Sequence, residues 1–128
     1  REVNNLKTKA KSNIKFTDAV SDKELVKYYK NAKALIMPQE EDFGIVAIEA
    51  QSFGVPVIAF KKGGVLDTVI PGKTGILFEK QTVESLTTAV KKFDRMKFNK
   101  EDLIKNSLKF SKKRFKQQFL DLVNKMLE

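Results

Sequence analysis

The sequence predicts an α/β fold in which helices cover both faces of a parallel sheet. Short apolar runs alternate along the chain with longer amphipathic segments, an alternation typical of parallel strands joined by helices. Glycine or proline stands at the ends of several of these segments, where such residues end helices and form turns. With 128 residues and 41% hydrophobic content the chain can bury one core, so we expect a single domain over residues 1–128.

The first elements are defined by a strand pattern, a helix start signal and a proline. Residues 13–16 carry alternating apolar side chains and predict a short strand. Ser21 followed by Glu24 resembles a capping box that opens an amphipathic helix. Residues 32–37 then predict a buried strand that ends at Pro38.

The central elements are bounded by glycine and proline in the same way. Residues 44–53 predict a helix that has Gly54 at its C-terminal end. Pro56 prevents continuation of that helix. Residues 57–60 form a continuous apolar run and predict the next strand.

The second half of the chain is expected to be mostly helical. Residues 65–70 predict a short helix, residues 76–78 a strand and residues 82–93 an amphipathic helix. Residues 101–128 predict helix to the end, with a break near Ser111.

An acidic cluster stands at the start of the helix predicted over residues 44–53. Glu40, Glu41 and Asp42 precede Phe43 and Gly44, and Glu49 lies about one and a half turns into the helix. Free amides in the first turn attract phosphate, while carboxylates accept hydrogen bonds from hydroxyl groups. The pattern therefore suits a ligand with both phosphate and sugar hydroxyls. Its spacing is equally compatible with acidic residues that only complement the helix dipole, with Glu49 exposed to solvent.

The composition restricts the chemistry that this chain can perform. It has no cysteine and no histidine, so thiolate metal sites, disulfides and histidine general bases are excluded. No apolar run approaches about 18 residues, and we expect a soluble, cytoplasmic protein. The first residue is Arg1 rather than methionine, which we interpret as the start of a fragment.

Positive charge is concentrated near the C-terminus. Residues 91–128 hold 12 of the 25 lysines and arginines but 5 of the 16 acidic residues. This basic tail is compatible with binding to anionic membranes, with binding to nucleic acid, or with simple solvated helix faces. Its aromatic residues Phe110, Phe115 and Phe119 are expected in core or interdomain packing.

Residues 72–74, Gly-Lys-Thr, match the end of a nucleotide-binding P-loop, but their context does not. A P-loop requires glycine five positions earlier, where this chain has Asp67, and a helix afterwards. The segment that follows instead has a strand pattern. We therefore expect a turn, and no nucleotide hydrolysis.

Several ordered motifs together resemble the C-terminal domain of a retaining GT-B glycosyltransferase of family 4, also described as glycosyltransferase group 1. They are Pro38-Gln39-Glu40-Glu41-Asp42-Phe43-Gly44, Glu49-Ala50, Gly54-Val55-Pro56-Val57-Ile58-Ala59, Gly63-Gly64 and Gly72-Lys73-Thr74-Gly75. Glu41 and Glu49 match the family's E-x7-E signature. The resemblance runs from about residue 13 to residue 78, and it implies a Rossmann-like three-layer sandwich that binds a nucleotide sugar.

The resemblance implies a role for each residue of the signature. Glu41 would contact hydroxyls of the donor sugar near the reacting centre and is the catalytic candidate. Glu49 would bind the ribose hydroxyls of the nucleotide, and Asp42 belongs to the same donor-binding loop. The backbone around the first turn would bind the distal phosphate, and the glycine pair would line the cleft. These backbone positions are Phe43, Gly44, Ile45, Val46, Gly63 and Gly64.

Some positions depart from the family pattern. Asp18 stands where glycine is usual in the segment that approaches the nucleobase, and Asp67 stands where glutamate is common. The Arg/Lys pair that clamps the diphosphate in the family has no counterpart here, and we do not assign its role to Lys61 or Lys62.

The function implied is transfer of a hexose, with retention, from a nucleotide diphosphate sugar to a glycan or lipid-linked acceptor. The sequences of residues 40–45 and 81–86 look most like those of bacterial mannosyltransferases of lipopolysaccharide or glycan assembly. The resemblance therefore implies GDP-mannose as the preferred donor and a UDP-sugar as the second choice. We expect no metal and no cofactor, a separate N-terminal acceptor domain, no nucleic-acid partner, and no transferase activity in this chain alone. The tail could add peripheral association with the inner face of the membrane. The alternative is a non-catalytic basic module that binds nucleic acid or anionic membrane.

Overall fold

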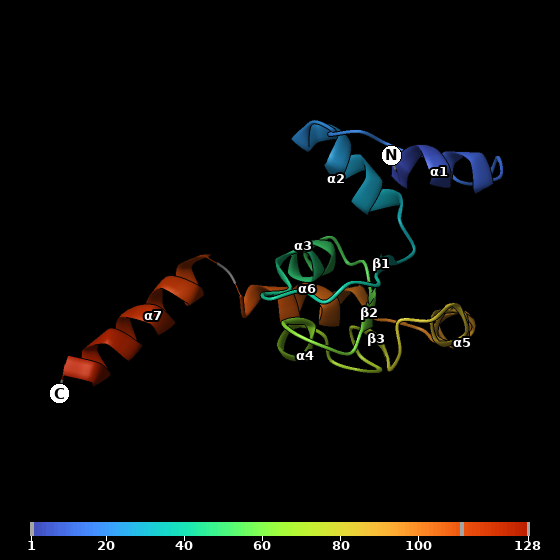
Figure 1. The fold of residues 1–128 in the computed structure, drawn as a ribbon. Helices are drawn as coiled ribbons and strands as arrows, with labels where there is room; N and C mark the ends of the chain where they lie inside the picture. Colours follow the sequence, from blue (N-terminus) through green and yellow to red (C-terminus); the bar gives the residue numbers. More distant parts are fainter. Residues whose placement is uncertain (1, 111, 128) are drawn as a thin grey trace.

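The computed structural model describes residues 2–110 and 112–127. Within these residues the sheet has three parallel strands in the order β1 (Leu35–Met37), β2 (Val57–Phe60) and β3 (Gly75–Phe78) (Figure 1). Val57 pairs with Leu35 on one side and with Gly75 on the other. The described helices are α1 (Glu2–Lys9), α2 (Asp22–Asn31), α3 (Ile45–Ser52), α4 (Val65–Thr68), α5 (Val83–Asp94), α6 (Lys100–Leu108) and α7 (Lys112–Leu127).

Two apolar clusters cover the two faces of the sheet. Val57 and Ala59 of β2 pack with Met37 and with residues of α2, α3 and α4. Ile58 and Phe60 point to the opposite face, where they pack with β3 and α5. This alternation follows from the period of two along a strand. Figure 1 shows α3, α4 and α6 on one side of the strands and α5 on the other, so the predicted Rossmann-like three-layer α/β/α fold is confirmed.

The predicted starts of the helices near residues 21 and 82 are confirmed. The Ser21 hydroxyl accepts a hydrogen bond from the Glu24 amide at 3.3 Å and caps α2. The Thr82 hydroxyl accepts one from the Ser85 amide at 3.1 Å and caps α5. In both cases a short polar side chain satisfies an amide that has no partner within the helix.

The strand predicted over residues 13–16 is wrong. This segment is irregular, and it connects α1 to α2 away from the sheet (Figure 1). The Ile14 amide donates to the carbonyl oxygen of Lys11 at 3.1 Å, in a turn. Ile14 and Phe16 are exposed. Apolar alternation produces a strand only where a neighbouring strand offers hydrogen-bond partners, and none lies beside this segment in the described part of the chain.

Several predicted boundaries are too wide. The strand predicted over residues 32–37 is shortened to Leu35–Met37, and the helix predicted over residues 65–70 ends at Thr68 because Val69 is extended. The strand predicted over residues 57–60 has the observed bounds.

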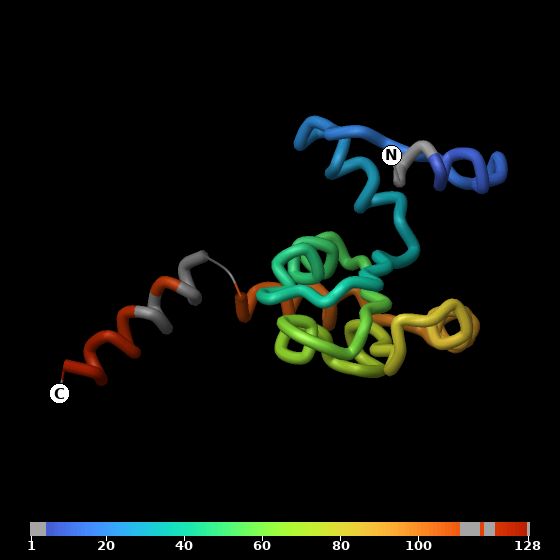
Figure 2. The backbone as a smooth tube through the Cα atoms, viewed as in Figure 1, coloured from blue at the N-terminus to red at the C-terminus, as the bar shows by residue number. Residues whose placement is uncertain are grey.

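The C-terminal region is divided as predicted into two helices, α6 and α7. The backbone of α7 extends away from the sheet and its covering helices (Figure 2). Phe110 is 39% exposed. Ser111 and the side chains of Phe115 and Phe119 lie outside the described residues, so the predictions made for them are not addressed. No described helix has the length and apolar character needed to cross a membrane.

Candidate functional site

Two loops meet at the carboxyl ends of β1 and β2. The loop after β1 contains the acidic cluster, and the loop after β2 contains the glycine pair. Glu41 and Gly63 form an isolated parallel bridge, and the Gly64 amide donates to the carbonyl oxygen of Glu41 at 2.5 Å. Ligands of parallel α/β sheets bind outside this edge, which makes the loop pair the candidate site.

The close approach of the two loops requires glycine at three positions. Gly44 and Gly63 have φ angles of 66° and 85°, in the left-handed region that side chains disfavour. Gly64 has an ordinary φ of −60°, but a Cβ atom there would lie 2.4 Å from the carbonyl carbon of Phe43. At Gly44 a Cβ would lie 2.7 Å from Oγ1 of Thr68. The loops therefore pack backbone against backbone.

The first turn of α3 begins at this junction. Gly44 is the N-cap and has no side chain with which to cap the helix. The first intrahelical hydrogen bond runs from the Ile48 amide to the carbonyl oxygen of Gly44 at 3.2 Å. The amides of residues 45–47 precede that bond and have no intrahelical acceptor. Such amides, at the positive end of a helix dipole, favour a bound anion.

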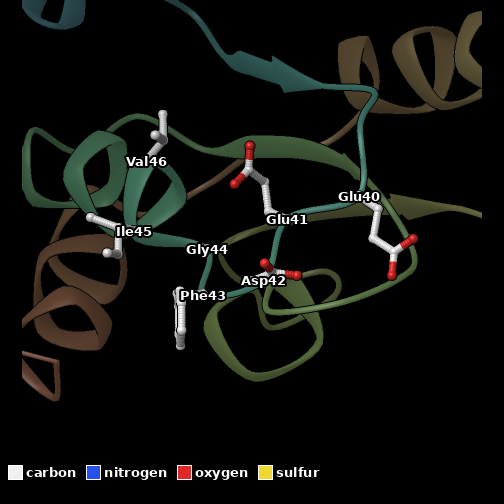
Figure 3. A pocket seen from close by; sticks show the side chains of 7 residues that line it. All are labelled: Glu40, Glu41, Asp42, Phe43, Gly44, Ile45 and Val46. Carbon is white, nitrogen blue, oxygen red and sulfur yellow. The ribbon is translucent and has the colours of Figure 1, made fainter.

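A cavity of about 220 Å³ lies at this helix start (Figure 3). Its lining is a continuous stretch of the chain: Glu40, Glu41, Asp42, Phe43, Gly44, Ile45 and Val46. In Figure 3 the Glu40 and Glu41 carboxylates point in different directions, and the Phe43 ring points away from Val46. The predicted donor-binding residues 41–46 are therefore together in one hollow.

Glu41 is the better-fixed carboxylate of the cluster. It is half-buried, and its Oε1 accepts a hydrogen bond from the Gln39 side-chain amide at 2.9 Å. Its backbone oxygen is held by Gly64. A carboxylate fixed in this way keeps further lone pairs to accept hydrogen bonds from ligand hydroxyls. Gln39 was not among the predicted site residues, and its position two residues before Glu41 is the signal that could have indicated it.

Two lysines near the site are engaged with carboxylates. Lys62 Nζ lies 3.7 Å from Glu40 Oε2, and Lys61 Nζ lies 3.2 Å from Glu79 Oε1. These pairs are exposed and contribute little to stability. Each of the two ammonium groups thus has a carboxylate neighbour.

Glu49 lies deeper along α3 and does not line the cavity. It is half-buried. Burial, and next the negative charge of Glu49, raise the pKa of Tyr29 in α2 above its ordinary value of 10.0. The charge of Glu49 therefore acts on Tyr29 of α2, and Glu49 lies about one and a half turns along α3 from the acidic loop. The structure brings Gly63 and Gly64 to Glu41, but none of Gly63, Gly64 and Glu49 lines the hollow.

The remaining sequence features have plain structural places. The segment from Gly72 to Thr74 forms a turn, in which the Lys73 and Thr74 amides donate to the carbonyl oxygen of Ile70. Strand β3 follows this turn, so the expectation of a turn is confirmed.

The two positions that depart from the family pattern are both exposed. Asp18 lies in the irregular segment before α2, and Asp67 lies on α4. In the described part of the chain, no three acidic residues are grouped so as to hold a metal ion.

Comparison with known proteins assigns this arrangement to a family. Residues 2–110 match the sequence profile of the family described as "Glycosyl transferases group 1". The chain belongs to this family. The group 1 glycosyltransferase domain is 36% identical over 85 residues to a GDP-mannose-dependent α-(1-6)-phosphatidylinositol monomannoside mannosyltransferase of Mycolicibacterium smegmatis, covering 60% of this chain and 22% of that protein. It is 31% identical over 109 residues to the capsular polysaccharide biosynthesis glycosyltransferase CapM of Staphylococcus aureus, covering 84% of this chain and 28% of CapM.

Solved structures agree with the family assignment. Sucrose-phosphate synthase from Thermosynechococcus elongatus superposes with a TM-score of 0.75 at 28% identity, over 98% of this chain and 33% of that one. The catalytic domain of starch synthase IV from Arabidopsis thaliana superposes with a TM-score of 0.72 at 21% identity, over 97% of this chain and 29% of that one, and supports the fold alone. The group 1 domain thus spans a third or less of each of these relatives.

Proposed function

We propose that this chain binds the nucleotide sugar donor of a hexosyltransferase that acts with retention of configuration. The observation that carries the proposal is the hollow at the start of α3, where free helix amides and the fixed Glu41 carboxylate lie within one continuous loop. The amides suit a diphosphate, and the carboxylate suits sugar hydroxyls. Family membership supports the same function.

The proposed division of labour follows the chemistry of each group. Amides of residues 44–46 bind the distal phosphate and stabilise the charge that develops on the departing diphosphate. Glu41 orients the sugar by accepting hydrogen bonds from its hydroxyls. Glu49 binds the ribose hydroxyls, for which the nucleotide must extend along α3 beyond the hollow. Gly63 and Gly64 hold the backbone of Glu41 in place.

GDP-mannose is the donor that we propose first. The mycobacterial relative is named as GDP-mannose-dependent. Residues 40–45 of this chain also resemble the corresponding segment of bacterial mannosyltransferases. A glycan or lipid-linked molecule is the proposed acceptor, because the named relatives include a phosphatidylinositol mannoside enzyme and a capsular polysaccharide enzyme. A UDP-sugar is the competing donor.

Transfer itself needs groups beyond those described. The chain spans a third or less of its named relatives, so we propose that the diphosphate clamp and the acceptor domain come from a part of the longer protein outside these 128 residues. The isolated chain is then expected to bind the donor weakly and to transfer no sugar. Sugar transfer by the purified chain would contradict this expectation.

Calorimetric titration of GDP-mannose and UDP-glucose into the chain tests the proposal. We expect the Glu41→Ala and Glu49→Ala variants each to lose about tenfold or more in GDP-mannose affinity, because each removes a charged hydrogen-bond acceptor. Glu84→Ala, an exposed position on α5, is the matched control and is expected to bind as the native chain does. Unchanged affinity in both site variants would show that the site assignment is wrong.

A further inference from the structure

Three buried polar side chains connect α6 to the candidate site. Gln51 of α3, Thr68 of α4 and Asn106 of α6 are 0%, 3% and 4% exposed. None of them lines the hollow at the start of α3. They lie where α3 packs against α6 and α4. Burying polar groups is unfavourable unless they are hydrogen-bonded, so their bonding partners indicate what they do.

The two amide side chains converge on one backbone oxygen. Gln51 Nε2 donates to the carbonyl oxygen of Thr68 at 2.9 Å. Asn106 Nδ2 donates to that same oxygen at 2.9 Å and to Gln51 Oε1 at 2.6 Å. Thr68 is the last residue of α4. The network therefore anchors the C-terminal end of this four-residue helix to both α3 and α6.

The other end of α4 is the glycine loop. The Thr68 hydroxyl donates to the carbonyl oxygen of Gly64 at 3.3 Å, and Gly64 is held against Glu41 by its amide. The same hydroxyl would lie 2.7 Å from a Cβ at Gly44, so it packs directly on the N-cap of α3. One chain of contacts thus runs from Asn106 through Thr68 to both loops of the site.

We infer that Gln51, Thr68 and Asn106 are positioning residues that fix the glycine loop against the acidic loop and so set the affinity of the site for its phosphate-bearing ligand. This role rests on the proposed donor-binding function. Apolar side chains could fill the same space, but only directional hydrogen bonds select one position of α4 relative to α3. Because the loops meet backbone to backbone, a small shift of α4 moves Gly64 away from Glu41 and releases the acidic loop that lines the hollow.

Asn106→Ala tests the role, with Leu103→Ala as its control. Leu103 is 1% exposed and lies on the same helix, but it has no part in the network, so its truncation lowers stability without breaking these hydrogen bonds. The first measurement is amide hydrogen exchange of Gly64 and the NMR shifts of Gly44, Gly63 and Gly64, all without ligand. The two variants are compared under conditions that give them the same free energy of unfolding. We then expect the Gly64 amide to exchange about tenfold or more faster in Asn106→Ala than in Leu103→Ala.

The second measurement is the affinity for GDP-mannose, which we expect to weaken about tenfold in Asn106→Ala and to change little in Leu103→Ala. If Asn106→Ala does not fold, Thr68→Val and Thr68→Ser test the next link, the hydrogen bond from the Thr68 hydroxyl to Gly64. Valine removes the hydroxyl and serine retains it, while both keep the backbone oxygen that Gln51 and Asn106 bind. Serine is expected to keep the native glycine signals and valine to lose them.

The two measurements separate the inference from the proposed function. Displaced glycine signals in a chain whose native form binds no sugar nucleotide would support the positioning role and refute the donor site. Glycine signals that respond alike in Asn106→Ala and Leu103→Ala, or alike in the two Thr68 variants, would overturn the positioning role. Native glycine signals together with weakened binding in Asn106→Ala would also overturn it.

Discussion

At the level of single residues, the site depends on glycine for two different reasons. Gly44 and Gly63 adopt positive φ angles, which side chains disfavour by about 1 to 2 kcal/mol. Gly64 has an ordinary φ, and its restriction comes entirely from the lack of space beside residues 42–44. The contact between the loops therefore requires both properties of glycine, its conformational freedom and its small size.

Gly64→Ala and Gly72→Ala separate these two causes. A Cβ at Gly64 would meet backbone atoms at 2.4 to 2.7 Å, and since backbone cannot rotate away we expect a loss of about 3 kcal/mol in the free energy of unfolding. Gly72 has a φ of 83° but no atom within 4 Å of the added Cβ, so we expect about 1 to 2 kcal/mol from conformation alone.

Chemical denaturation measures both losses, and GDP-mannose titration shows which one affects the site. Gly64→Ala is expected to abolish detectable binding, because the loops must separate, while Gly72→Ala is expected to bind normally. Equal effects of the two substitutions on binding would contradict the proposed role of the loop contact.

At the level of elements, α3 is stabilised mainly by what surrounds it. It has 8 residues, too few to persist alone in water, and no acidic residue in its first turn. Ala47 and Ala50 pack into the apolar cluster, and Gln51 is held by α6. Tyr29 of α2 stacks on Phe53 at its C-terminal end, with ring centroids 5.3 Å apart and planes 7° apart. The helix that presents the site is thus held along its length by three other helices.

The contact between α2 and α3 predicts a pH dependence at alkaline pH. Burial, and next Glu49, raise the pKa of Tyr29 in the folded chain, so the folded state keeps its proton where the unfolded state has lost it. The contribution of Tyr29 to the free energy of unfolding is therefore fully present below the ordinary tyrosine pKa of about 10. It is lost as the pH rises through the raised pKa of the folded state.

Chemical denaturation of the native chain and of Tyr29→Phe from about pH 8 to about pH 11.5 measures this dependence, because that range spans the ordinary tyrosine pKa of about 10. Phenylalanine keeps the stacked ring and cannot ionise, so its alkaline loss should be smaller. Tyr28→Phe on the exposed side of α2 is the control, since Tyr28 is 44% exposed. Equal alkaline losses in native and Tyr29→Phe chains would show that Tyr29 is not responsible.

At the level of the whole molecule, the acidic site and the basic tail are separate features. The hollow is lined by three carboxylates at the start of α3, whereas α7 extends away from the sheet (Figure 2). Lys105 and Lys109 of α6 and its end are exposed. Neither lysine lines the hollow, so donor binding and any binding of nucleic acid should be independent.

Lys105→Gln combined with Lys109→Gln tests this independence. We expect GDP-mannose affinity to be unchanged and affinity for a short DNA duplex, if measurable, to fall together with its salt dependence, because each lost phosphate contact lowers the slope by about 1. Titrations at two salt concentrations measure both quantities. Tight, salt-dependent duplex binding that survives in Glu41→Ala, with no sugar-nucleotide binding by the native chain, would favour the non-catalytic binding module instead.

The sequence alone determined the fold class, the order of most elements and the identity of the acidic loop. These follow from local causes: apolar periodicity, the cap at Ser21, and the glycines that end helices or form turns. The same local pattern misassigned residues 13–16, because alternation does not reveal whether a partner strand lies alongside.

Only the tertiary structure decided how the site is assembled. It placed Gly63 and Gly64 against the backbone of Glu41 and left Glu49 outside the hollow. It also joined Gln51, Thr68 and Asn106, which lie up to 55 residues apart in the chain. Contacts over such separations depend on the packing of whole helices, and no local pattern around any one of these residues encodes its distant partner.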